Sequence, residues 1–380
     1  MVFARLPGVD TGSHQPIKQP DMAEKDPVPT AEESVLNSLS TNMPNEPKIE
    51  NAQRLTGFGI GALSMLAAQA ATHPFLVFRR QCQVNGNAQR YHVTPFSVFQ
   101  VMIKLERKQG ASCLWKGYGS TYIVCAVNFF SEAAISAVTQ LPQDKPSSEM
   151  SMSEVASHLL LKCLGLIFSM PIAAASLVET VKTERIKDGY GVIDTFKDGL
   201  YRLVGWNRSS GRHGRLLPMW TIAAPTILHG MLHYLVESII QHLVLIKMGH
   251  TGLYGDCNED PPPTSDMTQS YYPELVANFM AFVVPDLILY PFETVLHRLY
   301  IQGTRTIIDD LDNAADVIPL STNYFSMLDC FRTIYQQEGI FGFYRGFGAL
   351  LIQCVVYFVI LKITKVVYVR LSQDFQGKTE

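Results

Sequence analysis

The chain has 380 residues, of which 47% are hydrophobic and only 17% are charged. Soluble proteins usually carry about 25% charged residues, so the deficit excludes an ordinary soluble domain and predicts a membrane protein, because charge is costly in hydrocarbon. The net charge of −3 excludes the strongly basic balance of a nucleic-acid-binding protein. The seven cysteines are scattered without a C-x-x-C pair, which predicts neither a disulfide framework nor a zinc cluster.

Residues 1–53 are predicted to form a disordered acidic tail. The first 50 residues hold eight acidic and four basic side chains among many Pro, Asn and Ser residues, a composition that cannot bury an apolar core. This segment has neither the apolar stretch of a secretory signal nor the Arg-rich, acid-poor composition of a matrix transit peptide. A second, short tail is expected at 373–380.

Six apolar stretches follow the tail, each long enough to cross or nearly cross a bilayer, which takes about 20 residues. Prolines and glycines interrupt these stretches, which predicts kinked helices that pack closely together. We therefore expect an all-α membrane protein with six transmembrane helices, near 54–79, 117–138, 155–181, 216–246, 274–301 and 346–369.

One sequence pattern recurs at the ends of these stretches in three versions. At the end of one stretch, a proline precedes charged residues. Before the next stretch, an acidic residue followed by Gly comes first, and a triplet of an aromatic residue, a basic residue and Gly follows. The second version is the faintest. The signature positions are Pro74, Arg79, Trp115, Lys116 and Gly117 in the first version, Pro171 in the second, and Pro291, Glu293, Arg298, Glu338, Gly339, Tyr344, Arg345 and Gly346 in the third.

This pattern resembles the signature of the mitochondrial carrier family, solute carrier family 25, over about residues 54–370. The resemblance implies a carrier fold of three pseudo-repeats, at 54–150, 151–255 and 256–372, of which the second is degenerate and the third begins with a linker. Each repeat is expected to join its two membrane helices through a short amphipathic helix. In the family, the acid of one repeat pairs with the base of the next, and the resulting ring closes a central cavity.

The ring that the resemblance implies is incomplete here. It needs three acids and three bases, but the second repeat has Ala173 and Ser176 at two of these positions. Only Glu293, Arg79 and Arg298 remain, so Glu293 and one arginine are predicted to form a static tie. The gate motif of the opposite side fits none of the even-numbered helices. Alternating access needs two states of comparable free energy, and we do not expect a normal transport cycle.

The runs at 79–84 and 301–309 resemble a divergent branch of the family. That resemblance implies the mitochondrial outer membrane, a cytosolic N-terminal tail, and an adaptor role in fission and fusion, cristae maintenance and lipid homeostasis. The implied partners are the fusion and fission GTPases and the cristae-organising complex. A solute or lipid transporter with degenerate gates and a purely structural scaffold are the alternatives.

His229, His233 and Glu237 lie at helical spacing on one face of the fourth stretch. Two histidines and a carboxylate can bind a metal, but a polar stripe lining a cavity is the preferred interpretation, and no metal or cofactor is expected. Basic residues at 208–215 suit either an anionic phospholipid headgroup or an ordinary solvated loop. The sequence offers no support for catalysis, so the chain is not predicted to be an enzyme.

Overall fold

The computed structural model describes residues 46–142, 152–183, 197, 219–248, 267–304, 306–312 and 316–376. Three expectations fall wholly or largely outside these residues. They concern the tail before residue 46, the amphipathic segment of the second repeat near 191–204, and the basic cluster at 208–215.

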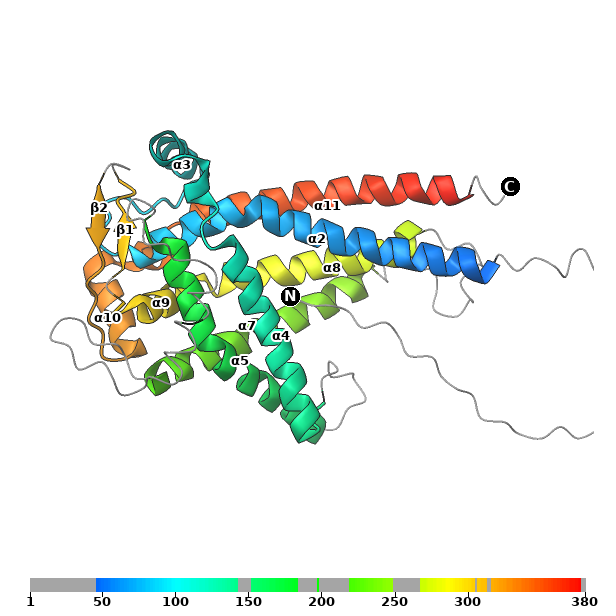
Figure 1. Cartoon of the computed structure of the whole chain (residues 1–380), viewed down its shortest axis with the longest axis horizontal. Helices are drawn as coiled ribbons and strands as arrows, with labels where there is room; N and C mark the ends of the chain where they lie inside the picture. Colours follow the sequence, from blue (N-terminus) through cyan, green and yellow to red (C-terminus); the bar gives the residue numbers. More distant parts are fainter. Residues whose placement is uncertain are drawn as a thin grey trace, which may run out of the picture.

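Long helices form the body of the described structure (Figure 1). Helices α2, α4, α5 and α11 contain stretches long and apolar enough to cross a membrane. Helices α8 and α9 together can form a fifth, bent span. Helix α7 is as long as α5, at 30 residues. It is not among these apolar spans, and it contains the polar stripe. The helices are α2 (Glu46–Val84), α4 (Tyr118–Thr139), α5 (Met152–Val181), α7 (Met219–Met248), α8 (Met267–Ile288), α9 (Tyr290–Ile301) and α11 (Phe347–Gln376).

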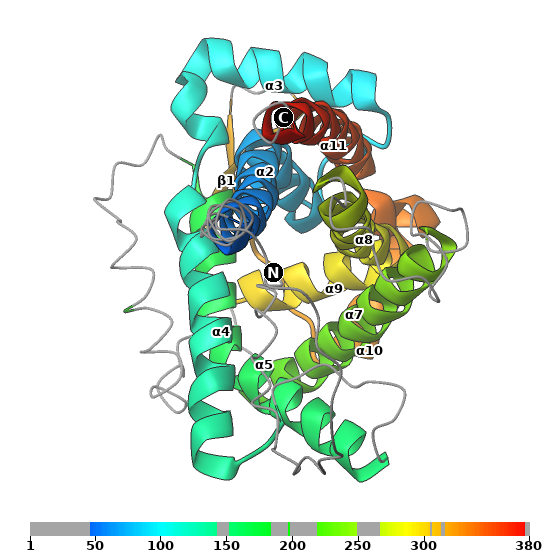
Figure 2. The same ribbon diagram turned by 90° about the vertical axis from the view of Figure 1, so that its right-hand side faces the viewer.

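Prolines occur at two kinds of position in these helices. Pro74 and Pro171 lie inside α2 and α5. Pro291 stands in the first turn of α9, where its missing N–H is not needed. The chain bends by 72° between α8 and α9, and this bend turns α9 across the end of the bundle (Figure 2).

Two short helices connect the membrane helices of the first and third repeats, as expected. They are α3 (Pro95–Gln109) and α10 (Met327–Glu338), followed by the 3-10 turns η1 (Ala111–Leu114) and η3 (Ile340–Tyr344). The boundary of the first membrane helix is different from the expected one. Helix α2 begins at Glu46 rather than near residue 54, because proline is tolerated in a first helical turn and Pro47 therefore does not delay its start.

A small β-hairpin is the one departure from the all-helical expectation within the described residues. Strands β1 (Ile307–Asp309) and β2 (Val317–Pro319) pair antiparallel, with Ile308 opposite Ile318. The fully buried Ile308 also bridges to Lys182 at the end of α5. The hairpin lies at the end of the bundle opposite the start of α2 and the end of α11 (Figure 1).

Two apolar clusters hold the two ends of the bundle. One joins α2, α8 and α11 and includes Leu275, Phe279 and Tyr368. The other joins α2, α5 and α9 to the hairpin and includes Leu177 and Ile308. Helix α4 packs along α5 but diverges from α2 along its length (Figures 1 and 2).

Candidate functional site

Arg79 of α2 lies at the centre of the candidate site. Its guanidinium donates from Nη2 to Glu293 Oε1 at 2.8 Å and from Nη1 to Asp286 Oδ2 at 2.9 Å. Gln83, one turn further along α2, donates to the other Glu293 oxygen at 2.9 Å. The side chain of Arg79 is only 4% exposed. Glu293 and Arg79 are therefore paired across the first and third repeats, and whether this pair is the static tie expected from the sequence stays a prediction.

Asp286 was missed from the sequence, although it is the second carboxylate of this tie. It sits on α8 just before the bend, outside the signature that directed attention to Glu293. His233 Nε2 lies 3.3 Å from Asp286 Oδ1, and His233 Nδ1 lies 3.8 Å from Glu237. Two members of the polar stripe therefore extend the tie into α7, whereas His229 stacks on Phe292. An aspartate inside an apolar stretch was the available signal.

Arg298 does not belong to the charged ring, so that part of the prediction was wrong. Both of its terminal nitrogens donate to the carboxylate of Glu338, and its Nε donates to the backbone oxygen of Gln83 at 2.9 Å. The helix explains the error, because residue 298 lies about 140° around the helix from residue 293. Arg298 and Glu293 consequently face different neighbours.

Glu338 pairs with a second signature residue, Arg345. The Arg345 guanidinium also donates to the backbone oxygens of Gly86 and Ala88 at 3.0 and 2.9 Å, and it lies over the ring of Tyr91. Three charged signature residues of the third repeat thus hold the loop that follows α2. Their arrangement is structural, since none of them lines the pocket described below.

Asp309 of β1 joins all three repeats through buried contacts. It accepts from Lys116 Nζ at 3.0 Å and Gln109 at 2.9 Å in the first repeat, and from Thr183 at 2.6 Å in the second. Burial raises the pKa of Asp309, but the Lys116 ammonium and these hydrogen bonds outweigh burial and hold that pKa below its ordinary value. We call Asp309, Lys116, Gln109 and Thr183 the Asp309 cluster.

The signature glycines and aromatics occupy turns rather than the pocket. Gly117, Gly339 and Gly346 have φ angles of +64°, +70° and +77°, which glycine adopts without the strain of a side chain. Trp115 is 44% exposed, as suits an interfacial anchor, and Tyr344 stacks on Tyr290 with centroids 6.1 Å apart.

Another ion pair lies farther from the Arg79 tie, between α4 and α5. Lys162 Nζ is 2.6 Å from Glu132 Oε2, and the ammonium also lies over the Tyr234 ring. The buried His158 is within 2.9 Å of the Tyr234 hydroxyl. The family's gate motif is absent here, yet a charged pair between neighbouring helices is present. Sequence reasoning missed it because Lys162 lies outside the motif.

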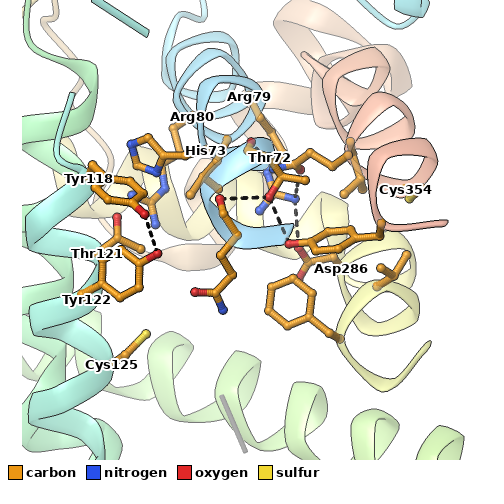
Figure 3. Close-up of a pocket in the computed structure, with 17 residues that line it drawn as sticks. Thr72, His73, Arg79, Arg80, Tyr118, Thr121, Tyr122, Cys125, Asp286 and Cys354 are labelled. Carbon is orange, nitrogen blue, oxygen red and sulfur yellow. Dashed lines mark hydrogen bonds and ion pairs between the residues drawn. The ribbon is translucent and has the colours of Figure 1, made fainter. Parts of the chain in front are cut away.

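A pocket of about 240 Å³ lies beside the Arg79 tie. It is lined by α2, α4, α8 and α11, including Arg79, Arg80 and Asp286 (Figure 3). The His229–His233–Glu237 stripe does not line it, although Asp286 connects the two. Within the described residues, no group of three His, Cys, Asp or Glu side chains is placed to hold a metal ion.

The sequence of this chain matches that of known carriers. A family model described as "Mitochondrial carrier protein" matches residues 51–140 and 268–374, more than half of the chain. The chain belongs to the mitochondrial carrier family. The matched segments cover the first and third repeats, and the region between them contains the repeat whose signature is faintest.

Several curated vertebrate proteins are similar over most of the chain. "Mitochondrial outer membrane protein SLC25A46" of Homo sapiens is 45% identical over 325 residues, covering 86% of this chain and 77% of the human protein. The protein of the same name from Danio rerio is 43% identical over 332 residues, covering 86% and 81%. "Solute carrier family 25 member 46" of Xenopus tropicalis is 42% identical over 322 residues, covering 84% and 76%.

Proposed function

We propose that this chain is a multi-pass adaptor of the mitochondrial outer membrane that has the carrier fold but does not cycle as a transporter. Its role would lie in mitochondrial fission and fusion, cristae maintenance and lipid homeostasis. The names of its vertebrate relatives support the outer membrane. Membership of a family of carriers, rather than enzymes, supports a non-enzymatic role.

The Asp309 cluster is the observation that carries this proposal. A transport cycle requires the repeats to separate at one face and then at the other. Asp309 is 1% exposed and contacts both other repeats, two of its three donors being Lys116 and Thr183. Separating a buried ion pair costs several kcal/mol, and the Arg79 tie lies on the same side. A closed end held in this way supports a static scaffold.

The partners in this proposal are the fusion and fission GTPases and the cristae-organising complex. The acidic N-terminal tail, placed in the cytosol, would contact the GTPases. The basic cluster at 208–215 would contact anionic phospholipid. Protease treatment of intact mitochondria tests the orientation: cleavage of the tail without rupture of the outer membrane supports it, and protection until rupture contradicts it.

Reconstitution and rescue together test the adaptor function. The purified chain in liposomes should give no saturable uptake across a broad solute panel. In cells that lack it, the same chain should restore mitochondrial shape and should co-purify with the GTPases. A variant without residues 1–45 should no longer co-purify with them. Saturable uptake, with normal mitochondrial shape in cells without the chain, would overturn the proposal.

A transporter with degenerate gates is the second candidate, and the pocket beside Arg79 favours it. The pocket lining combines apolar side chains, including Phe282 and Val283, with charged ones, including Arg80. Uptake that disappears when Asp286 is changed to Asn would favour this candidate over the adaptor.

A further inference from the structure

Arg80 differs from its neighbour Arg79 in having almost no protein partners. Within the part of the chain that the structure describes, its one hydrogen bond runs from Nη1 to Thr180 Oγ1 at 3.4 Å, and no residue there accepts from its buried Nε. Among the described residues, no carboxylate lies within ion-pair distance of it. A guanidinium has five N–H donors and keeps its charge. Arg80 therefore brings an incompletely satisfied cation into the membrane bundle.

The nearby carboxylates are already used by other groups. Asp286 accepts from Arg79 and contacts His233, while Glu293 accepts from Arg79 and Gln83. Arg79 extends to Asp286, whereas Arg80 lies on the side of the pocket lined by Tyr118 and Thr121 (Figure 3). A charge in hydrocarbon normally pairs with another group, and no described residue supplies that partner for Arg80.

The pocket wall around Arg80 offers further hydrogen-bonding groups. Gln69 lines the pocket, and its side-chain amide has no hydrogen bond within the described residues. The Tyr118 hydroxyl accepts from Tyr122 at 2.9 Å and keeps its own hydrogen to donate. The lining also contains apolar side chains, including Phe282 and Val283. An occupant that matches both kinds of side chain is amphipathic, with an anionic head and an apolar body.

The surroundings of the pocket favour entry from the membrane. Helix α4 diverges from α2 beyond the pocket (Figures 1 and 2). In the most apolar stretch of 111–139 no residue is buried, so α4 is covered by protein less than the other spans. Acyl chains can lie against α4 while the head remains at the pocket.

We propose that Arg80 binds the phosphate of a membrane phospholipid whose acyl chains lie between α2 and α4. Guanidinium and phosphate form charge-assisted hydrogen bonds of matched geometry, and the phosphate supplies the charge that Arg80 lacks. A free phosphate ion shares this chemistry but lacks the apolar body that suits the apolar side chains of the lining. The site goes beyond the adaptor function and does not depend on which partners the tail binds.

Lipid analysis of the purified chain tests the site. The full chain is extracted in a zwitterionic detergent, and bound phospholipid is counted by mass spectrometry. The wild type should retain a single phospholipid, which Arg80→Gln should lose. Arg107→Gln, the same change at an exposed position of α3, should retain it. Equal retention by Arg80→Gln would overturn the proposal.

A second measurement uses only the wild-type chain, so it does not depend on the folding of a variant. Cys125 lines the pocket, whereas Cys163 of α5 does not. Short-chain phosphatidylglycerol added to delipidated chain should slow maleimide labelling of Cys125 but not of Cys163, measured peptide by peptide. Equal protection of Cys125 by inorganic phosphate would assign the site to a soluble anion. Protection by neither the lipid nor phosphate would show that the pocket binds neither of them. Both results contradict the lipid site.

Discussion

The second and third repeats differ in the chemistry of their buried contacts. In the third repeat, the signature charges Arg298, Glu338 and Arg345 form a buried cluster around the loop after α2. In the second repeat, Ser176 forms a hydrogen bond with Ser120 at 3.0 Å, and Leu177 packs in an apolar cluster. Both repeats nevertheless place their helices in one bundle (Figure 2).

This difference separates the requirements of folding from those of transport. Helix packing tolerates the replacement of charges by small and apolar side chains, because close contact is what membrane helices need. A switching ring needs charges in all three repeats. The second repeat has no charge at its ring positions Ala173 and Ser176, yet α5 packs against α4 and α7. This combination supports the proposal that the chain depends on the fold rather than on the switch.

The largest expected effect is the loss of Glu338 in the third repeat. Glu338→Gln leaves two buried arginines without their carboxylate, and breaking a buried pair in this way costs about 3–5 kcal/mol. Thermal unfolding in detergent should show a strongly lowered midpoint. Glu106→Gln, on the exposed side of α3, is the matched control and should leave the midpoint unchanged. Equal midpoints for both variants would show that the cluster is dispensable.

The loss of Asp309 should rank second. Asp309→Asn leaves Lys116 buried without an acid, at a cost of about 3 kcal/mol, because one cation rather than two loses its partner. Changing Lys116 to Met in the same chain should restore much of the loss, since the stranded charge is then removed. If the double variant is as unstable as the sum of the single variants, the two side chains do not act as a pair.

The same carboxylate should make stability depend on pH. The folded pKa of Asp309 lies below its ordinary value, so its contribution is complete above the unfolded pKa of about 3.9 and decreases as the pH falls toward the folded pKa. The difference in unfolding midpoint between wild type and Asp309→Asn should be constant from pH 7 to pH 5 and should shrink below about pH 4. A difference that already shrinks near neutral pH would contradict this assignment.

The sequence predicted the bundle better than it predicted the pairing within the site. Apolar length and the recurring prolines located the long helices, and the signature located Arg79 and Glu293. The hairpin was missed because three-residue strands are too short to show alternation. Asp286 could have been found as a charge in an apolar stretch, but its partner is 207 residues away, and no local pattern encodes that contact.

A smaller effect is expected at the ion pair of α4 and α5. The side chains of Glu132 and Lys162 are 19% and 25% exposed, so their coupling should be about 1 kcal/mol, closer to a surface pair than to a buried one. A double-mutant cycle with Glu132→Gln and Lys162→Met measures it through unfolding midpoints. A coupling as large as that of Asp309 with Lys116 would mean that both ends of the bundle are held by buried charge.

The smallest effect is expected in the second repeat, and it gives the sharpest test of the comparison with the third. Ser176→Ala removes the hydrogen bond to Ser120, but Ser120 keeps its bond to the Gly117 oxygen at 2.9 Å. No group is stranded, so the cost should be about 0.5–1 kcal/mol. Ser157→Ala, which removes only a hydrogen bond to the Ser153 oxygen within α5, is the control. A cost near that of Glu338→Gln would mean that the second repeat also depends on a polar contact. Its lost charges would then have been replaced by another specific interaction, and packing alone would not explain how the degenerate repeat keeps its place in the bundle.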